Sequence, residues 1–131
     1  MQNKNGLAPK KINLLLPFYL DKGFSAIFEA LSFNVLWADT QEELEKLIEF
    51  TRIDIAIEWQ HGERDFIIRD LLRQYKKNAK IFLALNWNGK IPPDFDKLGY
   101  VDVINVPFNF NELKLKFFAV DPMLWTIFQC S

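Results

Sequence analysis

Cysteine, histidine and excess charge are all scarce in this sequence. The single cysteine, Cys130, excludes an internal disulfide, so we expect a reducing compartment, most simply the cytoplasm. The net charge of -1 gives no overall field to attract nucleic acid or an anionic membrane, and neither is expected as a partner. The one histidine, His61, could join Glu58 and Glu63 as metal ligands. A lone histidine beside a glycine is more often a solvated turn residue, and no metal is expected.

Long apolar runs and glycine-rich loops are also missing. The apolar stretch over residues 12–20 is interrupted by Pro17 and is too short for a membrane span or a secretion signal. No phosphate-binding loop follows it, because residues 17–20 contain neither glycine nor lysine. These absences indicate a single cytosolic domain without a nucleotide cofactor.

Aromatic residues, by contrast, are abundant. The chain of 131 residues is half hydrophobic and one quarter charged, which is ordinary for a globular domain. Thirteen phenylalanines and four tryptophans are a large load for this size, and we expect some of them to form a contact area on the surface.

The run over residues 53–59 is the strongest structural signal. It is short, apolar and rich in isoleucine, which indicates a strand buried on both faces at the centre of a parallel sheet. It closes with Glu58 and Trp59. Ligands of open α/β sheets bind outside the carboxyl ends of the strands, so any chemistry is expected next to Glu58.

Further apolar runs alternate with amphipathic segments along the chain. Thr40 with Glu43, and Asn109 with Glu112, have the spacing of helix-capping pairs. Prolines 92 and 93 and Gly99 restrict the fourth helix to one or two turns. Strands are predicted over residues 12–16, 34–38, 53–59, 80–85 and 100–106, and helices over 21–31, 40–50, 63–77, 94–98 and from 109 onward.

This alternation predicts a doubly wound α/β fold, with five parallel strands in the order 2-1-3-4-5 by analogy with the flavodoxin-like arrangement. Residues 1–10 read as a loose polar lead, residues 11–119 as the domain and residues 120–131 as an apolar extension.

Residues 106–113 resemble the end of a bacterial response-regulator receiver domain, whose fifth strand finishes in Lys-Pro-Phe before a helix that often opens with Glu-Leu. Here Val106, Pro107 and Phe108 are followed by Asn109, and Glu112-Leu113 opens the helix. The elements agree in order and length from about residue 11 to residue 119. The resemblance implies a receiver fold, a cis Val106–Pro107 peptide bond and a role in bacterial signalling.

The sequence departs from that family at every position that carries its chemistry. Glu58 stands in place of the phosphorylated aspartate, and the resemblance implies a degenerate site at the other positions: Pro17 and Phe18 for the acidic metal ligands, Asn86 for the serine or threonine, and Val106 for the lysine. One carboxylate cannot supply the oxygen ligands that Mg²⁺ needs, and a transferred phosphoryl group would lack a counter-charge. We therefore expect no phosphotransfer, no cofactor and no enzymatic activity. Glu58 either imitates a phosphorylated aspartate in a locked state, faces solvent, or caps the next helix.

The segment after residue 120 is almost entirely apolar and must be covered. It could pack on its own domain, exchange with a second copy, or lead into an output domain beyond residue 131. Receivers usually dimerise through the fourth helix, fifth strand and fifth helix. The interface candidates on or after that face are Phe108, Phe110, Phe118, Trp125 and Phe128.

The sequence thus favours a phosphorylation-independent pseudo-receiver. It would act as a homodimerising interaction module with other signalling proteins, in signal transduction or transcriptional control. The alternative is a small flavodoxin-like binder of a ligand or cofactor, with an aromatic crevice formed by Pro17, Phe18, Trp59, Trp87 and Pro107. A third possibility is the regulatory domain of a longer DNA-binding protein.

Overall fold

The protein is built on one five-stranded parallel sheet. The structure, a computed structural model, describes residues 12–17, 22–59, 66–86 and 89–120. Every strand pair is parallel, and the order is β2-β1-β3-β4-β5, which confirms the predicted fold class and strand order. The strands are β1 (Asn13–Leu15), β2 (Asn34–Leu36), β3 (Ile55–Trp59), β4 (Lys80–Asn86) and β5 (Asp102–Val106).

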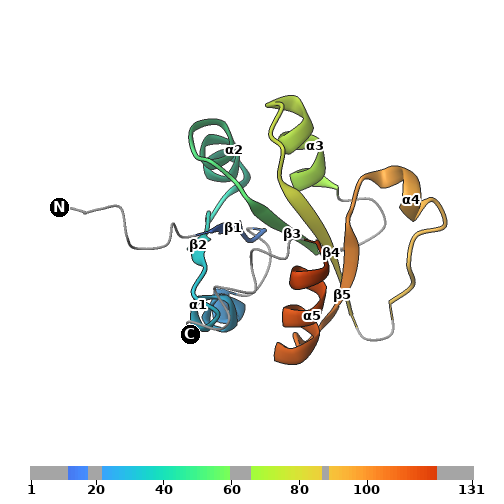
Figure 1. The fold of residues 1–131 in the computed structure, drawn as a ribbon. Helices are drawn as coiled ribbons and strands as arrows, with labels where there is room; N and C mark the ends of the chain where they lie inside the picture. The colour runs from blue at the N-terminus through green and yellow to red at the C-terminus, as the bar shows by residue number, and fades with distance from the viewer. Residues whose placement is uncertain (1–11, 18–21, 60–65, 87–88, 121–131) are drawn as a thin grey trace.

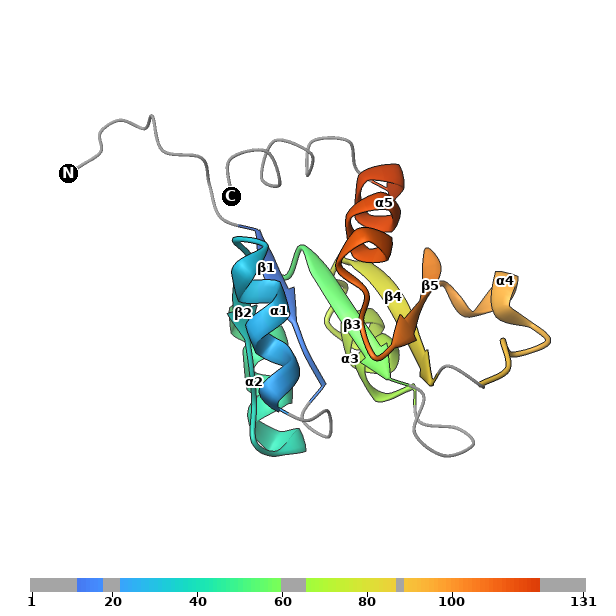
Figure 2. The same ribbon diagram turned by 90° about the horizontal axis from the view of Figure 1, so that it is seen from below.

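Helices cover both faces of this sheet (Figure 1). On one face, α1 lies over the β2–β1 half and α5 over the other half, as Figures 1 and 2 show together. On the opposite face lie α2 and α3, and Leu98 of the short α4 joins their core. The helices are η2 (Lys22–Phe24, a 3-10 turn), α1 (Ser25–Ala30), α2 (Gln41–Phe50), α3 (Ile67–Gln74), α4 (Phe95–Leu98) and α5 (Phe110–Val120).

Both predicted capping pairs are present. The Glu43 N–H donates to Thr40 Oγ1 at 3.1 Å, and the Glu112 N–H donates to Asn109 Oδ1 at 3.0 Å. The Glu112 carboxylate does not turn back onto its own helix. It accepts from the backbone N–H and the side-chain amide of Asn105, at 3.1 and 2.8 Å, and so attaches the first turn of α5 to β5.

Helix α3 is shorter than predicted, because it ends at Gln74 and not at residue 77. Lys76 adopts a left-handed backbone conformation with φ 55°, and the Lys77 N–H donates to the Leu72 carbonyl at 2.8 Å. This bond closes the helix in the manner of a Schellman motif. Glycine is the residue that usually marks such a helix end. Because two lysines stand here instead, the sequence pattern predicted that the helix continues through them. The predicted start, residues 63–65, lies outside the described residues.

The core is two hydrophobic layers, one on each face of the sheet. Phe117 of α5 is fully buried at the centre of the α1–α5 layer. Its ring contacts those of Phe28, Phe33 and Phe82, with centroid separations of 6.4, 5.5 and 4.8 Å. These are the separations of favourable aromatic pairs, so much of the aromatic load holds α5 on the sheet.

We predict that Phe117→Ala lowers the free energy of unfolding by about 3–5 kcal/mol, the usual cost of deleting a buried phenylalanine ring. Phe50→Ala on α2 is the control, because Phe50 is 77% exposed and the loss of its ring should change stability by less than about 0.5 kcal/mol. Urea unfolding followed by circular dichroism measures both. Equal losses in the two variants would contradict this assignment of the core.

Candidate functional site

Glu58 is the penultimate residue of β3 and is fully buried. Side chains alternate between the two faces of a strand, and Glu58 shares its face with Ala56 of the α2–α3 layer. The carboxylate lies under the start of α3. Oε2 accepts from the Ile68 N–H at 2.9 Å, and Oε1 accepts from the Arg69 N–H at 3.0 Å.

These bonds make Glu58 the N-terminal cap of α3. The first N–H groups of a helix have no partner within it, and Phe66, the residue at the cap position, makes no capping bond with its side chain. A carboxylate at this position also meets the positive end of the helix dipole. Of the alternatives for Glu58, the solvent-facing carboxylate is wrong and the helix cap is confirmed.

Tyr100 supplies a third donor to the same carboxylate. Its hydroxyl donates to Glu58 Oε1 at 2.9 Å across 42 positions of sequence, and the tyrosine is 7% exposed. Its ring lies near those of Phe66 and Phe95, with centroid separations of 6.1 and 6.2 Å. Glu58 thereby connects β3, the start of α3 and the turn between α4 and β5. Sequence spacing gave no signal for this tyrosine.

Two arginines of α3 hold the end of α4. Arg73 Nη2 donates to the Leu98 carbonyl at 3.1 Å, and Arg69 Nη1 approaches the same oxygen at 3.5 Å. The Arg69 guanidinium also lies 4.7 Å from the centroid of the Phe66 ring. Gly99 follows with φ 93°, and a Cβ there would come within 2.9 Å of Arg73 Nη2. A side chain at residue 99 would therefore disturb this contact.

Of the remaining degenerate positions, Pro17 and Val106 are buried. Pro17 is buried, and Val106 is 7% exposed in the α1–α5 layer. Asn86 pairs with Val106 through β4 and β5. The Val106–Pro107 peptide bond is cis, the isomer that the resemblance implies. Phe18 lies outside the described residues.

The predicted aromatic crevice is described only in part. Trp59 is partly buried and packs against the α1–α5 layer, and Pro107 is exposed. Trp87, His61 and Glu63 lie outside the described residues. Within the part of the chain that the structure describes, no three histidine, cysteine or acidic side chains come close enough to hold a metal ion.

The interface candidates that the structure describes differ in how exposed their side chains are. Phe108 is partly buried and packs edge-on against Phe24 and Phe28, at 5.3 and 5.1 Å between ring centroids, so part of its ring is used within the domain. Phe110 and Phe118 of α5 are 43% and 37% exposed. Leu115, which the sequence argument missed, is more exposed than either and lies three residues before Phe118 on one helix face. Trp125 and Phe128 lie outside the described residues.

Among the helices that the structure describes, none is both long and apolar enough to cross a membrane. No protein-family model matches the chain, and no curated protein matches it. The similarity that does exist is to solved structures.

Two signal receiver domains and one response regulator show this similarity. The signal receiver domain of an HD-domain protein from Pseudomonas fluorescens Pf-5 has a TM-score of 0.66 at 12% identity, over 89% of this chain and 99% of that one. The signal receiver domain of a putative LuxO repressor protein from Vibrio parahaemolyticus has a TM-score of 0.63 at 16% identity, over 91% of this chain and 93% of that one. A response regulator from Thermotoga maritima has a TM-score of 0.62 at 20% identity, over 92% of this chain and 99% of that one. With the shared strand order, these likenesses show that the chain has the receiver fold.

Proposed function

We propose that this chain is a receiver-like domain that works without phosphorylation, as a protein-interaction module in bacterial signalling or transcriptional control. The observation that supports this most directly is the state of Glu58. Its carboxylate is buried and accepts from two N–H groups of α3 and from the Tyr100 hydroxyl. A carboxylate used in this way is a structural anion, not an acceptor open to a phosphoryl donor.

The surroundings of Glu58 support the same conclusion. Mg²⁺ requires oxygen ligands in a near-octahedral arrangement, and Pro17 stands where receivers place an acidic ligand. Val106 stands where they place a lysine, and its side chain belongs to the hydrophobic core. A phosphoryl group in transfer would then have neither a metal nor an ammonium group to balance its charge.

The network around Glu58 also suggests how the domain works without a phosphoryl group. In a switchable receiver-like domain, a transient modification must reposition the helices. Here permanent hydrogen bonds from Glu58 hold the start of α3 and the turn before β5 together. We therefore assign the domain one constitutive conformation, in which Glu58 has the structural place of a modified aspartate.

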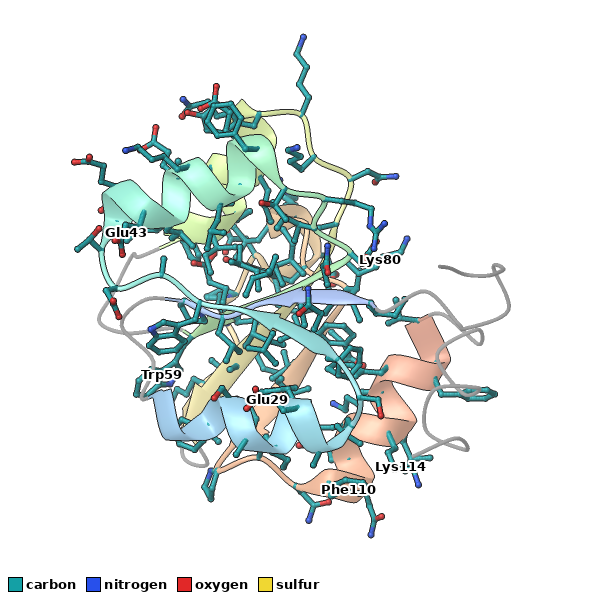
Figure 3. The ribbon with its side chains drawn as sticks, turned by 90° about the vertical axis from the view of Figure 1, so that its left-hand side faces the viewer. Glu29, Glu43, Trp59, Lys80, Phe110 and Lys114 are labelled. Carbon is teal, nitrogen blue, oxygen red and sulfur yellow. The ribbon has the colours of Figure 1, made fainter. Side chains whose placement is uncertain are left out.

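The partner that we propose for this conformation is a second copy, through the exposed side of α5. Leu115, Phe110 and Phe118 supply apolar surface, and Figure 3 shows Phe110 with Lys114 on this helix. Lys116 Nζ donates to the Val103 carbonyl at 2.6 Å, so its charge is used within the domain and fixes α5 against β5. Burial of such side chains is the main favourable term in association. Other signalling proteins would bind the same surface of α5. The domain would act in the cytoplasm and would make no direct contact with nucleic acid.

We predict that incubation with acetyl phosphate and Mg²⁺ leaves the mass of the protein unchanged, because the metal ligands and the lysine are replaced. Intact-mass spectrometry at neutral pH measures this. Glu58→Asp is the informative companion: it restores the acceptor type but neither Pro17 nor Val106, and should also stay unlabelled. A phosphoryl group on any carboxylate of the unaltered chain would contradict the proposal.

We predict that Glu58 and Tyr100 stabilise the fold as a pair. Glu58→Gln and Tyr100→Phe should each lower the free energy of unfolding by about 1.5–3 kcal/mol, the range for a hydrogen bond to a charged group. The double variant should lose less than the sum, because the two residues share one bond. Tyr75→Phe is the control: its hydroxyl donates to Glu45 at the protein surface, and we expect a change within about 0.5 kcal/mol. Strict additivity in urea unfolding would argue against the Glu58–Tyr100 bond.

We predict a dimer in solution that Leu115→Glu converts to a monomer, because a carboxylate would have to be desolvated in the contact. Size-exclusion chromatography with light scattering gives the mass directly. Phe50→Glu is the matched control, since Phe50 is a 77% exposed aromatic residue on α2, on the other face of the sheet, and should leave the dimer intact. A monomeric unaltered chain would remove the homodimer from the proposal and leave the phosphorylation result untouched.

A further inference from the structure

A cavity of about 190 Å³ lies at the end of the sheet opposite Glu58. Lys80, which opens β4, and Trp59, which closes β3, mark the two ends of the sheet in Figure 3. Its described lining combines apolar and polar residues. The apolar lining is Ile12, Ile55, Phe82 and Val120, and the polar lining is Asp54, Asn78 and Lys80.

Val120 places the end of α5 in this wall. It is the last residue of α5, it lines the cavity, and it packs against the α1–α5 layer of the core. Residue 121 follows it directly in the sequence. Whatever follows Val120 is held near the opening by a covalent tether, which corresponds to a millimolar effective concentration for a short flexible connection.

The segment that follows has the composition of a buried element. Its apolar residues are Met123, Leu124, Trp125, Ile127 and Phe128, and Asp121 carries the one charged side chain in residues 121–131. Exposure of so many apolar side chains in a row would be unfavourable in water. Pro122 has no N–H to continue the hydrogen bonds of α5, so a change of direction is favoured directly after the helix.

We propose that residues 121–131 dock in cis into this cavity. The cavity is larger than the apolar space of about 150 Å³ that admits benzene, so an aromatic ring fits. The five residues after Val120, up to Trp125, span about 7 Å as a helix and up to about 18 Å when extended. Lys80, an exposed residue of the lining, would offer a cation to Asp121 of the docked segment.

Docking in cis is independent of the proposed function. It would keep Trp125 and Phe128 away from the α5 surface, so a dimer through Leu115 and Phe118 could form with or without it. The aromatic residues on α5 and those beyond it would then make two different contacts, although the sequence pattern predicted a single interface.

Disulfide trapping in the full chain tests the docking. In a Cys130→Ser background, Thr126→Cys is combined with Asn78→Cys in the lining of the cavity, or with Glu42→Cys on α2 as the control. The Glu42 side chain is 83% exposed and belongs to the opposite face and end of the sheet. A disulfide needs Cα atoms within about 7 Å. We expect an intramolecular bond to Cys at position 78 and none to position 42 under mild oxidation.

Peptide mapping by mass spectrometry distinguishes the outcomes. Equal trapping at both positions, or none at position 78, would overturn docking in this cavity. A bond between position 78 of one chain and position 126 of another would overturn docking in cis, because it would place the segment of a second copy there.

Thermal unfolding of the full chain gives a second readout that needs no crosslink. Trp125→Ser should lower the midpoint by about 4 °C or more, because a docked ring would lose its apolar contacts. Phe50→Ser, at a 77% exposed aromatic position, should shift it by less than about 2 °C. Equal shifts would overturn the proposal.

Discussion

A carboxylate removed from water has to be matched by donors, and this requirement organises the carboxyl-terminal end of the sheet. Glu58 is fully buried, and its oxygens accept from two backbone N–H groups and one phenolic hydroxyl. Hydrogen bonds to an ionised acceptor are stronger than neutral ones, and loss of a donor would leave a buried charge undercompensated. The start of α3 and the position of Tyr100 are therefore set by this one side chain.

The constraint extends from Glu58 to the short helix α4. Tyr100 lies two residues after Leu98, whose carbonyl accepts from Arg73, and Arg69 provides an N–H to Glu58 from its backbone while its guanidinium stacks on Phe66. A four-residue helix has too few internal bonds to be stable alone, since nucleation is unfavourable. Contacts with α3 and the core supply the stabilisation that the few internal hydrogen bonds of α4 cannot provide. The geometry of the α4–β5 turn thus depends on the same α3 helix that Glu58 caps.

Local signals in the sequence predicted most of the fold, and long-range partners explain what they missed. The strand runs and the pairs Thr40–Glu43 and Asn109–Glu112 act within a few residues, so spacing alone identified them. The bond from Tyr100 to Glu58 joins residues 42 apart, and no local pattern encodes it. Phe108 shows the same limit: its place after β5 suggested a surface ring, but contacts to Phe24 and Phe28 from the first helical segment bury much of it. Exposure is decided by elements far away in the chain.

The two ends of the sheet therefore offer different possibilities to a partner. At the carboxyl-terminal end, Glu58 already accepts from donors within the domain, Pro17 is buried and Val106 belongs to the core. At the amino-terminal end, the lining of the cavity leaves apolar surface without a described side chain to fill it. On α5, Lys116 and Glu112 use their charged groups to hold the helix on β5, which leaves Leu115 and Phe118 as its outward apolar contacts. The charged groups of Glu58, Glu112 and Lys116 thus hold elements of the domain together, while Leu115 exposes apolar surface on α5.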